Sequence, residues 1–448
     1  MELSVKPTKP TIVLLLVFGV IWWGYACRAE GGTSPHAAAN RTVPAAAIPD
    51  GYLTPEQFGA RGDGTDDTAA FVAVHRAIQA KGYGGIVLQP GRTYGINIKA
   101  RSVLFRMSNL GSYGIDARGG ATIRDLGTYR PGENAIAFQF INCRNIRIRG
   151  GLRLISQAYD GRSNTTGLSW FKFVSGCNGI NADVDFDGGL HGFHFYRAYG
   201  EPPSASTVNA NLAIRAKQVY YPELHERSGD QVTTVIEAVD CGRAFFIFGG
   251  GNNVTARITA KNSFGFLISS DSAGNGAENI TIDYRDRDSD RNKADAWRCG
   301  VQFYNEKPAV FRNIRVRLDV RNAAGSPFYD TFSINKVSDT GGQDTRGRGH
   351  MLDGLDIAGV SEQVNGRKHI TTYGAFAAPD QVRNVRIHDF RGTGRGSDIH
   401  LALGDALADA VIIENVALPE KSVRILHTTG RAVFDGNATR NDGSKQLK

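Results

Sequence analysis

Three polar side chains in two short aromatic segments have the types that proton abstraction requires. Residues 170–197 contain the phrases WFKFVSG and GFHFYRAYG, in which phenylalanine alternates with polar residues. Because successive side chains of a strand point to opposite faces, inward phenylalanines turn Lys172 outward in one strand, and His194 with Tyr196 outward in a later one. A base, a cation and a phenol on one outer strip suit metal-independent β-elimination next to a uronate carboxylate. The sequence therefore predicts Lys172, His194 and Tyr196 as catalytic residues; the alternative is a solvated face without function.

A second set of polar side chains has a spacing that suits hydrolysis. The segment NADVDFDGG places three carboxylates at alternate positions, Asp183, Asp185 and Asp187, so that they line one face of a strand. Paired carboxylates serve a glycoside hydrolase, or they bind a calcium ion that bridges the enzyme to a uronate. We expect these three residues to contact substrate, and the alternative is an ordinary solvent-facing row. No motif supports a metal site, so we expect no cofactor.

Further candidates are residues of the kind that stack on sugars or hold their carboxylates. Residues 198–235 are interpreted as long connections between strands, and such connections often form walls over a groove. Trp297 and the arginine after it form a similar pair later in the chain. The remaining predicted substrate-binding residues are His191, Arg197, Tyr220, Tyr221, His225 and Arg298.

These side chains share a strip only if the chain winds into stacked coils. An aromatic strand, a small or polar turn and an asparagine-led strand recur, as in AIAFQFINCRNIRIRG (135–150) and GVQFYNEKPAVFRNIRVRL (300–318). The asparagines are Asn145, Asn253, Asn279, Asn313, Asn384 and Asn415. Asparagine and glycine tolerate the positive φ of a tight bend, and irregular periods of ~20–40 residues favour a β-solenoid over a propeller or a sandwich. On such coils Gln139 and Gln302 occupy the position analogous to Lys172.

A solenoid needs a cap over its apolar end, and residues 66–81 (DDTAAFVAVHRAIQAK) predict an amphipathic helix for that purpose. Residues 84–91 (GGIVLQPG) then predict the first strand and turn. The acidic residues Asp63, Asp66 and Asp67 precede the helix, but their spacing lacks the twelfth-position Glu of an EF-hand. We therefore interpret them as turn and helix-cap residues.

The opening segments FGARGDGTDDTAAFVAVHRAI (58–78) and GGIVLQPGRTY (84–94) resemble the pectate-lyase-like superfamily of right-handed parallel β-helices. The resemblance implies this all-β fold with an N-terminal capping helix over residues 51–436, with the cap and first coil in 51–100. It also implies a long polysaccharide substrate, often rich in uronic acid, in a groove along the solenoid. The chain departs from polygalacturonases, because only Leu190-His191-Gly192 echoes their Gly-His-Gly and the coils hold no Asp-Asp pair. The Asp-Pro-His-Asp segment of epimerase-type members is absent as well.

Composition and the first residues indicate an exported soluble protein. The chain has 448 residues, 41% hydrophobic and 21% charged, which excludes a polytopic membrane protein and a disordered chain. Residues 1–30 read as a signal peptide, and the alternatives are a membrane anchor retained through residues 11–27 and a lipoprotein modified at Cys27. Residues 31–50 read as a linker and 437–448 as a disordered tail. The net charge of +8 favours an anionic partner, and without a nucleic-acid motif we expect no nucleic acid.

Four cysteines lie in the predicted solenoid. Cys143 and Cys177 each end an aromatic strand, whereas Cys241 and Cys299 each precede the glycine that opens one. Equivalent positions on neighbouring coils would lie ~4.8 Å apart, which permits either disulfides or a ladder of packed thiols. We favour the packing ladder.

Taken together, the sequence predicts an exported, periplasmic or extracellular enzyme that cleaves an acidic polysaccharide by metal-independent β-elimination. A glycoside hydrolase built on the aspartate row is one alternative, and a non-catalytic glycan-binding or adhesion protein is the other. The expected partner is the polysaccharide, with membrane contact only through an N-terminal anchor. The oligomeric state stays open.

Overall fold

The computed structural model describes most of the chain from residue 49 onward. The described ranges are 49–158, 165–249, 251–270, 276–287, 300–305, 309–321, 330–334, 351–363, 369–372, 382–394, 399–402, 411–418, 422–426, 432–437 and 445–446. The chain divides into two units, Met1–Ala47 and Ile48–Lys448, and the first lies outside the described residues together with the predicted signal or anchor. In the described part of the chain no helix is long and apolar enough to cross a membrane.

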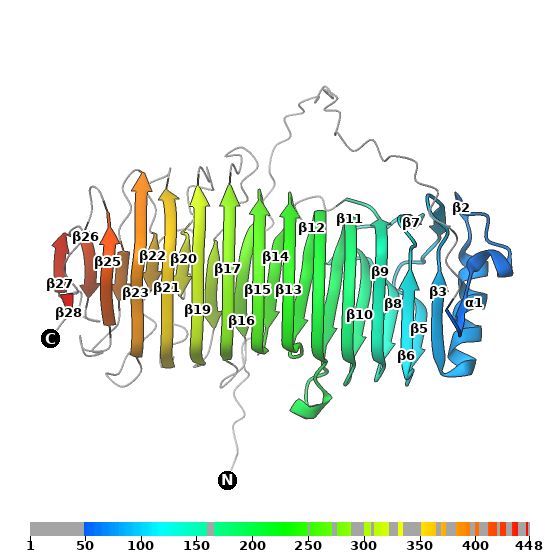
Figure 1. The fold of residues 1–448 in the computed structure, drawn as a ribbon, viewed down its shortest axis with the longest axis horizontal. Helices are drawn as coiled ribbons and strands as arrows, with labels where there is room; N and C mark the ends of the chain where they lie inside the picture. The colour runs from blue at the N-terminus through cyan, green and yellow to red at the C-terminus, as the bar shows by residue number, and fades with distance from the viewer. Residues whose placement is uncertain are drawn as a thin grey trace, which may run out of the picture. The chain divides into compact units, whose positions relative to one another are not determined.

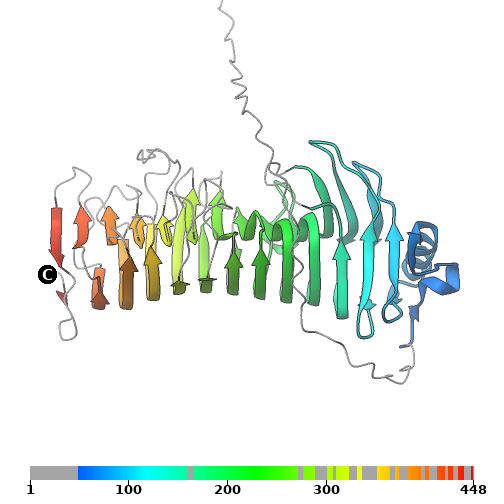
Figure 2. The same ribbon diagram turned by 90° about the horizontal axis from the view of Figure 1, so that it is seen from above.

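The second unit is a parallel β-helix. Its strands pair with the strands of the coils before and after them, and the coils follow one another in chain order from the blue to the red end of the ribbon (Figure 1). Two long sheets face each other across the core (Figure 2). We name them the asparagine sheet and the phenylalanine sheet after the residues that recur in them.

The asparagine sheet consists of β1 (Tyr52–Leu53), β3 (Tyr83–Val87), β6 (Ser112–Asp116), β9 (Arg144–Ile155), the first parts of β11 (Asn178–Tyr196) and β12 (Val208–Glu226), β13 (Asp230–Val239), β15 (Gly251–Lys261), β17 (Ala277–Arg287), β19 (Val310–Arg321), β21 (Met351–Gln363), β23 (Val382–Gly394) and β25 (Val411–Ala417). A short third stack, β2 (Asp63–Asp66), β4 (Thr93–Ile96) and β7 (Ala121–Asp125), continues into the second half of β9. The long strands therefore span two faces of the coil.

The phenylalanine sheet consists of β5 (Val103–Ser108), β8 (Asn134–Ile141), β10 (Gly167–Val174), the last parts of β11 and β12, β14 (Arg243–Phe248), β16 (Phe264–Ser270), β18 (Val301–Asn305), β20 (Phe332–Ile334), β22 (Ile370–Thr372), β24 (Ile399–Ala402) and β26 (Ser422–Leu426). Its inward side chains form a column in which the rings of Phe105, Phe138, Phe171 and Phe193 follow at centroid distances of 5.0, 5.2 and 5.2 Å. This packing buries the phenylalanines and leaves the intervening residues on the outer face.

The predicted asparagine bends are confirmed at all six residues, and five of these residues occupy one position in the coil. Asn145, Asn253, Asn279, Asn313 and Asn384 all have φ between 51° and 57°. Their amides form a ladder along the sheet, in which Asn279 Nδ2 donates to Asn253 Oδ1 and Asn313 Nδ2 donates to Asn279 Oδ1, both at 2.9 Å. The column of left-handed bends continues through residues that the repeat did not identify, Gly179, Asn209, Gln231 and Gly354, all at positive φ.

The sixth asparagine occupies a different position in the coil. Asn415 has φ 48°, but the register pairs it with Asp389 rather than with Asn384. The spacing of 31 residues between Asn384 and Asn415 is therefore not a coil period, and the inclusion of Asn415 in the repeat was wrong. Asp389 itself has φ 45°, so a short polar residue marks a second bend in these last coils.

The N-terminal cap is confirmed as one helix, α1 (Thr68–Lys81), preceded by the 3-10 turn η1 (Pro55–Phe58). Asp67 occupies the N-cap position, but its carboxylate accepts the backbone N–H groups of Arg61 and Gly62, so it fixes the preceding turn. On the buried face His75 stacks on Phe105 with ring centroids 4.1 Å apart. Burial lowers the pKa of His75 to about 4, so this histidine is neutral in the folded protein at pH 7.

The predicted packing of thiols is confirmed for Cys143 and Cys177, which lie at equivalent positions of neighbouring coils, whereas Cys241 lies at another corner of its coil. Cys143, Cys177 and Cys241 are free and buried. Their thiols face backbone carbonyls of the coil before, as Cys177 Sγ does toward Phe140 O at 3.5 Å. Burial raises the pKa of the Cys177 thiol to about 12, which keeps it protonated and unreactive. Cys27 and Cys299 lie outside the described residues.

The last coils end in a change of strand direction. The strand β27 (Ala432–Asn437) pairs antiparallel with β26, and β28 (Lys445–Gln446), inside the predicted tail, pairs antiparallel with β25. All other strand pairs given for the chain are parallel.

Candidate functional site

The register of the phenylalanine sheet places the predicted catalytic residues side by side. Lys172 on β10 pairs with His194 on β11, and Gln139 on β8 pairs with Lys172. Leu224 follows His194 on β12. The alignment of Lys172 with His194 on neighbouring coils is therefore confirmed. Their position between inward phenylalanines on the same strands puts both on the outer side of this sheet.

The imidazole of His194 is enclosed by polar and aromatic neighbours on that outer side. Its Nε2 lies 3.0 Å from Oε2 of Glu226, and its ring meets that of Tyr196 edge to face at 5.7 Å. The ammonium of Lys172 lies 4.0 Å from the centroid of the Tyr196 ring. The side chain of His194 is 7% exposed, so an outward residue here is sheltered from most of the solvent.

A second histidine extends this cluster. The ring of His191 lies 4.8 Å from that of His194 and stacks on Tyr221 at 5.5 Å. Its Nδ1 lies 2.7 Å from Oγ of Ser169, and the guanidinium of Arg243 donates to Tyr221 Oη at 2.9 Å. We define the site cluster as Ser169, Lys172, His191, His194, Tyr196, Tyr221, Glu226 and Arg243.

Burial sets the protonation of the cluster. It holds the pKa values of His194 and His191 well below the usual range, and the positive charge of Lys172 acts in the same direction. Both imidazoles are therefore neutral at pH 7. Burial also lowers the pKa of Lys172, and the negative charge of Glu226 opposes this shift. Neutral imidazoles beside an ammonium are an arrangement that can accept a proton next to a bound anion.

Sequence reasoning missed Ser169, Glu226 and Arg243. Glu226 follows from the alternation that selected His194, because it pairs with Tyr196 in the register. The alternation was not recognised in the sequence because the residues before Glu226 reverse the usual order, with polar side chains inward and Leu224 outward. Arg243 carries no sequence signal beyond its place before an aromatic strand.

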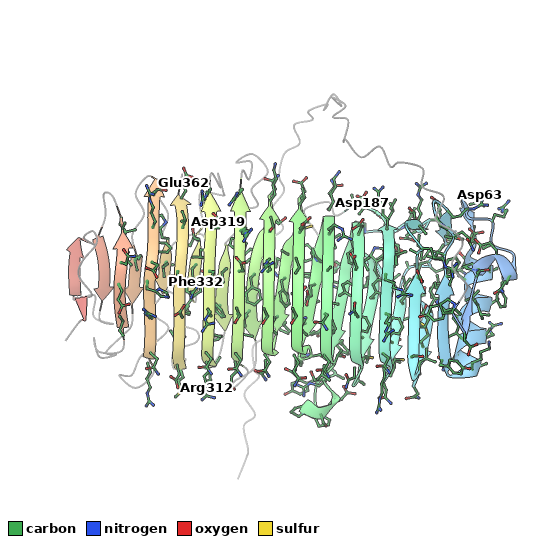
Figure 3. The ribbon with its side chains drawn as sticks, in the orientation of Figure 1. Asp63, Asp187, Arg312, Asp319, Phe332 and Glu362 are labelled. Carbon is green, nitrogen blue, oxygen red and sulfur yellow. The ribbon has the colours of Figure 1, made fainter. Side chains whose placement is uncertain are left out.

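The aspartate row lies elsewhere and is already engaged. Asp183, Asp185 and Asp187 share one outer face, as predicted, but that face belongs to the part of β11 that precedes the phenylalanine sheet (Figure 3 labels Asp187). Arg215 donates to Asp183 at 2.5 Å and also pairs with Asp185. Arg153 pairs with Asp187 at 2.5 Å. The row is therefore a set of ion pairs across coils, distant in the coil from His194.

The connection predicted over residues 198–235 is mostly strand. The long loop covers residues 197–207 with the 3-10 turn η2 (Pro203–Ala205), and a short turn at residues 227–229 separates β12 from β13, which ends at Val239. Tyr220 and Tyr221 are consequently strand residues, and Tyr221 is buried within the site cluster. The loop prediction was wrong because the Tyr-Tyr-Pro-Glu segment lacks the phenylalanine alternation of the other coils.

The interpretation of His225 as a sugar-contacting residue was wrong. Its side chain is fully buried in the core, between Phe195 and Phe245 at centroid distances of 4.7 and 4.8 Å. Its Nε2 donates to Oε1 of Glu223 at 2.6 Å, and Thr234 donates to the other oxygen of that carboxylate at 2.7 Å. Both carboxylate oxygens of Glu223 are thereby satisfied, whereas Nδ1 of His225 is buried without a hydrogen-bond partner.

Two further candidates complete the set. Arg197 follows Tyr196, and its guanidinium donates to the carbonyls of Arg227 at 2.7 Å and Glu201 at 3.3 Å. Arg298 lies outside the described residues, as does Trp297.

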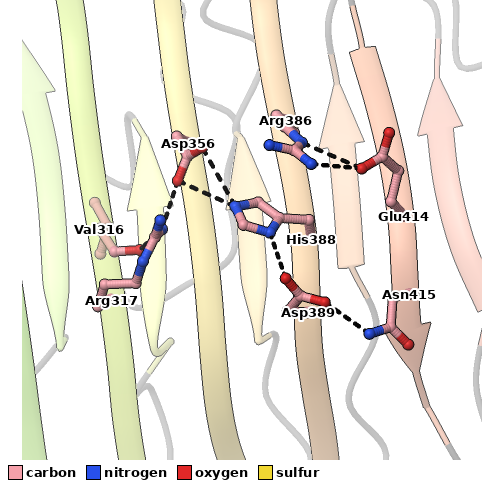
Figure 4. Close-up of polar contacts among 8 residues, drawn as sticks. All are labelled: Val316, Arg317, Asp356, Arg386, His388, Asp389, Glu414 and Asn415. Carbon is pink, nitrogen blue, oxygen red and sulfur yellow. Dashed lines mark hydrogen bonds and ion pairs between the residues drawn. The ribbon is translucent and has the colours of Figure 1, made fainter.

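The outer face of the asparagine sheet holds another histidine, but it is fully partnered. His388 lies between Asp389, 2.8 Å from its Nδ1, and Asp356, 3.3 Å from its Nε2 (Figure 4). Arg317 pairs with the same Asp356, and Arg386 pairs with Glu414 at 2.7 Å. Arg317, Arg386 and His388 each meet a carboxylate on a neighbouring coil, and Asp389 accepts from Asn415. Within the described ranges no group of three or more His, Cys, Asp or Glu is arranged to hold a metal ion.

Comparison with known proteins supports the fold. No protein-family model matches the sequence, and no curated protein matches it. Three solved structures align over most of the chain at low identity, and they are pectate-lyase-like right-handed β-helix proteins. An exopolygalacturonase of Thermotoga maritima aligns with TM-score 0.53 and 13% identity, covering 83% of this chain and 92% of that chain.

The other two have similar scores. The A-module of the mannuronan C-5 epimerase AlgE6 of Azotobacter vinelandii aligns with TM-score 0.54 and 14% identity, covering 82% of this chain and 100% of that chain. An endo-xylogalacturonan hydrolase of Aspergillus tubingensis aligns with TM-score 0.54 and 13% identity, covering 82% and 99%. The predicted right-handed parallel β-helix fold with one N-terminal helix is thereby confirmed.

Proposed function

We propose that the protein is an exported enzyme that cleaves an acidic, uronate-containing polysaccharide by β-elimination at the site cluster. The observation that carries this proposal is the position of His194, whose Nε2 lies 3.0 Å from Oε2 of Glu226 and which pairs with Lys172 on the neighbouring coil. The three solved structures with this fold are named for enzymes that act on polygalacturonan, mannuronan and xylogalacturonan.

His194 has the geometry of a general base. Because a carboxylate only accepts hydrogen bonds, Nε2 of His194 carries the proton that faces Glu226 at 3.0 Å. Its Nδ1 then holds a lone pair, and within the described part of the chain it has no hydrogen-bond partner. Glu226 fixes this tautomer and stabilises the imidazolium that forms when Nδ1 accepts the C5 proton of the uronate.

Lys172 supplies the charge that makes this proton acidic. Its ammonium contacts the Tyr196 ring at 4.0 Å and is free of any carboxylate partner in the ranges described. Placed against a uronate carboxylate, it stabilises the negative charge that develops at C5 and its carboxylate. Burial lowers the pKa of Lys172, and a partly desolvated cation attracts a bound anion more strongly than a solvated one.

The remaining step is departure of the sugar at C4. As the C5–H electron pair forms the C4=C5 double bond, the C4–O bond breaks and its oxygen takes a proton from the hydroxyl of Tyr196. The proton on His194 then returns to solvent and Tyr196 is reprotonated, so the cycle balances. In the alternative assignment Tyr196 abstracts the C5 proton and His194 donates a proton to the leaving oxygen.

Hydrolysis is less well supported. A glycoside hydrolase needs two carboxyl groups that flank the bond. Of the described residues, Glu226 is the one carboxylate in contact with His194, and Asp183, Asp185 and Asp187 are engaged by arginines on another face.

The test is incubation of the full-length protein with a panel of acidic and neutral polysaccharides. We expect ultraviolet absorbance of a conjugated double bond with uronate polymers. Reducing ends without this absorbance would indicate a hydrolase, and binding without either signal would indicate a non-catalytic glycan-binding protein. Fractionation of the source cells tests the proposed export.

Variants then test the residues. We expect His194→Gln to lower kcat by about 10²–10⁴-fold, the usual contribution of a general base. His388→Gln is the matched control, because this histidine also faces outward but lies on the asparagine sheet, and its activity should equal that of the wild type. Equal losses in both variants would refute the assignment.

A further inference from the structure

A groove runs along one corner of the solenoid next to the site cluster. Its volume of about 360 Å³ is within the size range of pockets that hold small ligands. One register column crosses it, in which Asp230, Asn252, Glu278 and Arg312 lie on successive coils. At ~4.8 Å per coil this column is ~14 Å long, enough for a short oligosaccharide. Figure 3 labels Arg312, near the starting ends of the strands of the asparagine sheet.

The groove contains one arginine whose charge has no counter-charge. Glu278 lies 3.5 Å from Arg312, and Glu226 lies 3.2 Å from Arg227. By contrast, Arg197 contacts only the backbone carbonyls described above, and no carboxylate of the described residues pairs with it. Its guanidinium has five N–H donors, of which these contacts use two. Donors therefore remain for an anion that enters the groove.

The groove and the site cluster share a connection. Glu226 accepts from Arg227 in the groove wall and from His194 in the cluster. Tyr199 is 84% exposed, and its ring lies 5.7 Å from the Arg227 guanidinium. An exposed aromatic ring beside guanidinium groups is suited to a sugar that presents an apolar face and a carboxylate.

We propose that this groove is a binding subsite for the uronate residues next to the cleaved bond, with Arg197 as the residue that recognises their carboxylate. The inference rests on the proposed function, because it requires an acidic oligosaccharide at the site cluster. It also gives the direction of the bound oligosaccharide, which extends from the site cluster, formed by β10, β11, β12 and β14, along the solenoid axis toward β19. Arg227 couples the subsite to the cluster through Glu226.

The experiment measures binding separately from cleavage. The probes are oligogalacturonate and oligomannuronate, each with its carboxyl-reduced counterpart, and Kd is measured by calorimetry on full-length His194→Gln protein. In this background we expect Arg197→Met to weaken binding of the acidic oligosaccharides about ten-fold or more, the usual effect of losing a charged hydrogen bond. Arg257→Met, at an exposed arginine on β15, is the matched control and should change nothing.

The outcomes separate the subsite from the reaction. Equal weakening of acidic and carboxyl-reduced probes by Arg197→Met would indicate a structural role and overturn the proposal. Arg197→Lys, which keeps the charge, should retain part of the affinity, and an unchanged Kd in Arg197→Met would also refute it. Binding lost in Arg197→Met without cleavage by wild type would support the subsite while refuting the lyase. If wild type neither binds nor cleaves any uronate probe, both proposals fail.

Discussion

Replacement of Asn279 tests the physical basis of the solenoid. Asn279 has φ 57° and takes part in two ladder bonds, donating to Asn253 and accepting from Asn313, both at 2.9 Å. Each bond is solvent-exposed, so we assign about 0.5–1 kcal/mol to it. Alanine additionally carries the left-handed penalty of about 1–2 kcal/mol. We therefore expect Asn279→Ala to lower the free energy of unfolding by about 2–4 kcal/mol.

Asn279→Gly is the matched comparison. Glycine loses the same two bonds but adopts positive φ without steric cost, so we expect a loss of about 1–2 kcal/mol. The assay is urea unfolding followed by far-ultraviolet circular dichroism, with hydrogen exchange to locate the opening in β15, β17 and β19. A solenoid transmits strain mainly to nearest-neighbour coils, so exchange should rise there first. An alanine variant as stable as the glycine variant would refute the role of positive φ.

Other predictions concern single residues. Phe171→Ala should lower the free energy of unfolding by about 3–5 kcal/mol in the same urea assay, because it empties one position of the ring column; a loss below about 1 kcal/mol would contradict close packing. Asp185→Asn should change stability by less than about 1 kcal/mol and leave cleavage unchanged, and loss of activity would instead favour the hydrolase. His75 has a pKa of about 4 when folded, against about 6.5 when unfolded. As pH falls below 6.5, the histidine therefore binds a proton in the unfolded chain but not in the folded one. The free energy of unfolding should decrease by about 3 kcal/mol by pH 4, and His75→Phe should remove this pH dependence. In a pH profile of kcat, the acid limb should lie below the ordinary histidine pKa, because His194 becomes protonated there. The alkaline limb should lie below the ordinary lysine pKa, because Lys172 loses its charge there. Limbs at the ordinary pKa values of histidine and lysine would contradict the burial of these two residues.

The fold was predictable from the sequence because its signals are local and repeated. Asparagine before an alternating strand marks a left-handed bend at Asn145 and again at Asn313, and the alternation of WFKF fixes which side chains enter the core. Those two rules also placed Lys172 beside His194. The error at Asn415 has the same origin, since a left-handed asparagine identifies a bend but not its position in the coil.

The rest of the site depends on information that the local pattern does not contain. In the segment PELHE the side chains of Glu223 and His225 enter the core, whereas Leu224 lies on the outer side, where it is also buried. This reverses the usual direction of polar and apolar side chains. A buried carboxylate is stable there only because His225 and Thr234 satisfy it, and that is a property of contacts between strands. The engagement of Asp185 by Arg215, 30 residues later in the sequence, is likewise visible only once the coils are stacked.

The reversal of strand direction at the C-terminal coils has a consequence for how copies of the protein meet. A parallel solenoid ends in exposed backbone donors and acceptors, which form a template for another chain. Here the far edges of β25 and β26 are occupied by the antiparallel strands β28 and β27. At the opposite end α1 packs against the first coil. A second copy therefore meets antiparallel strands at one end and a helix at the other, and neither end presents the parallel edge that would continue the coil.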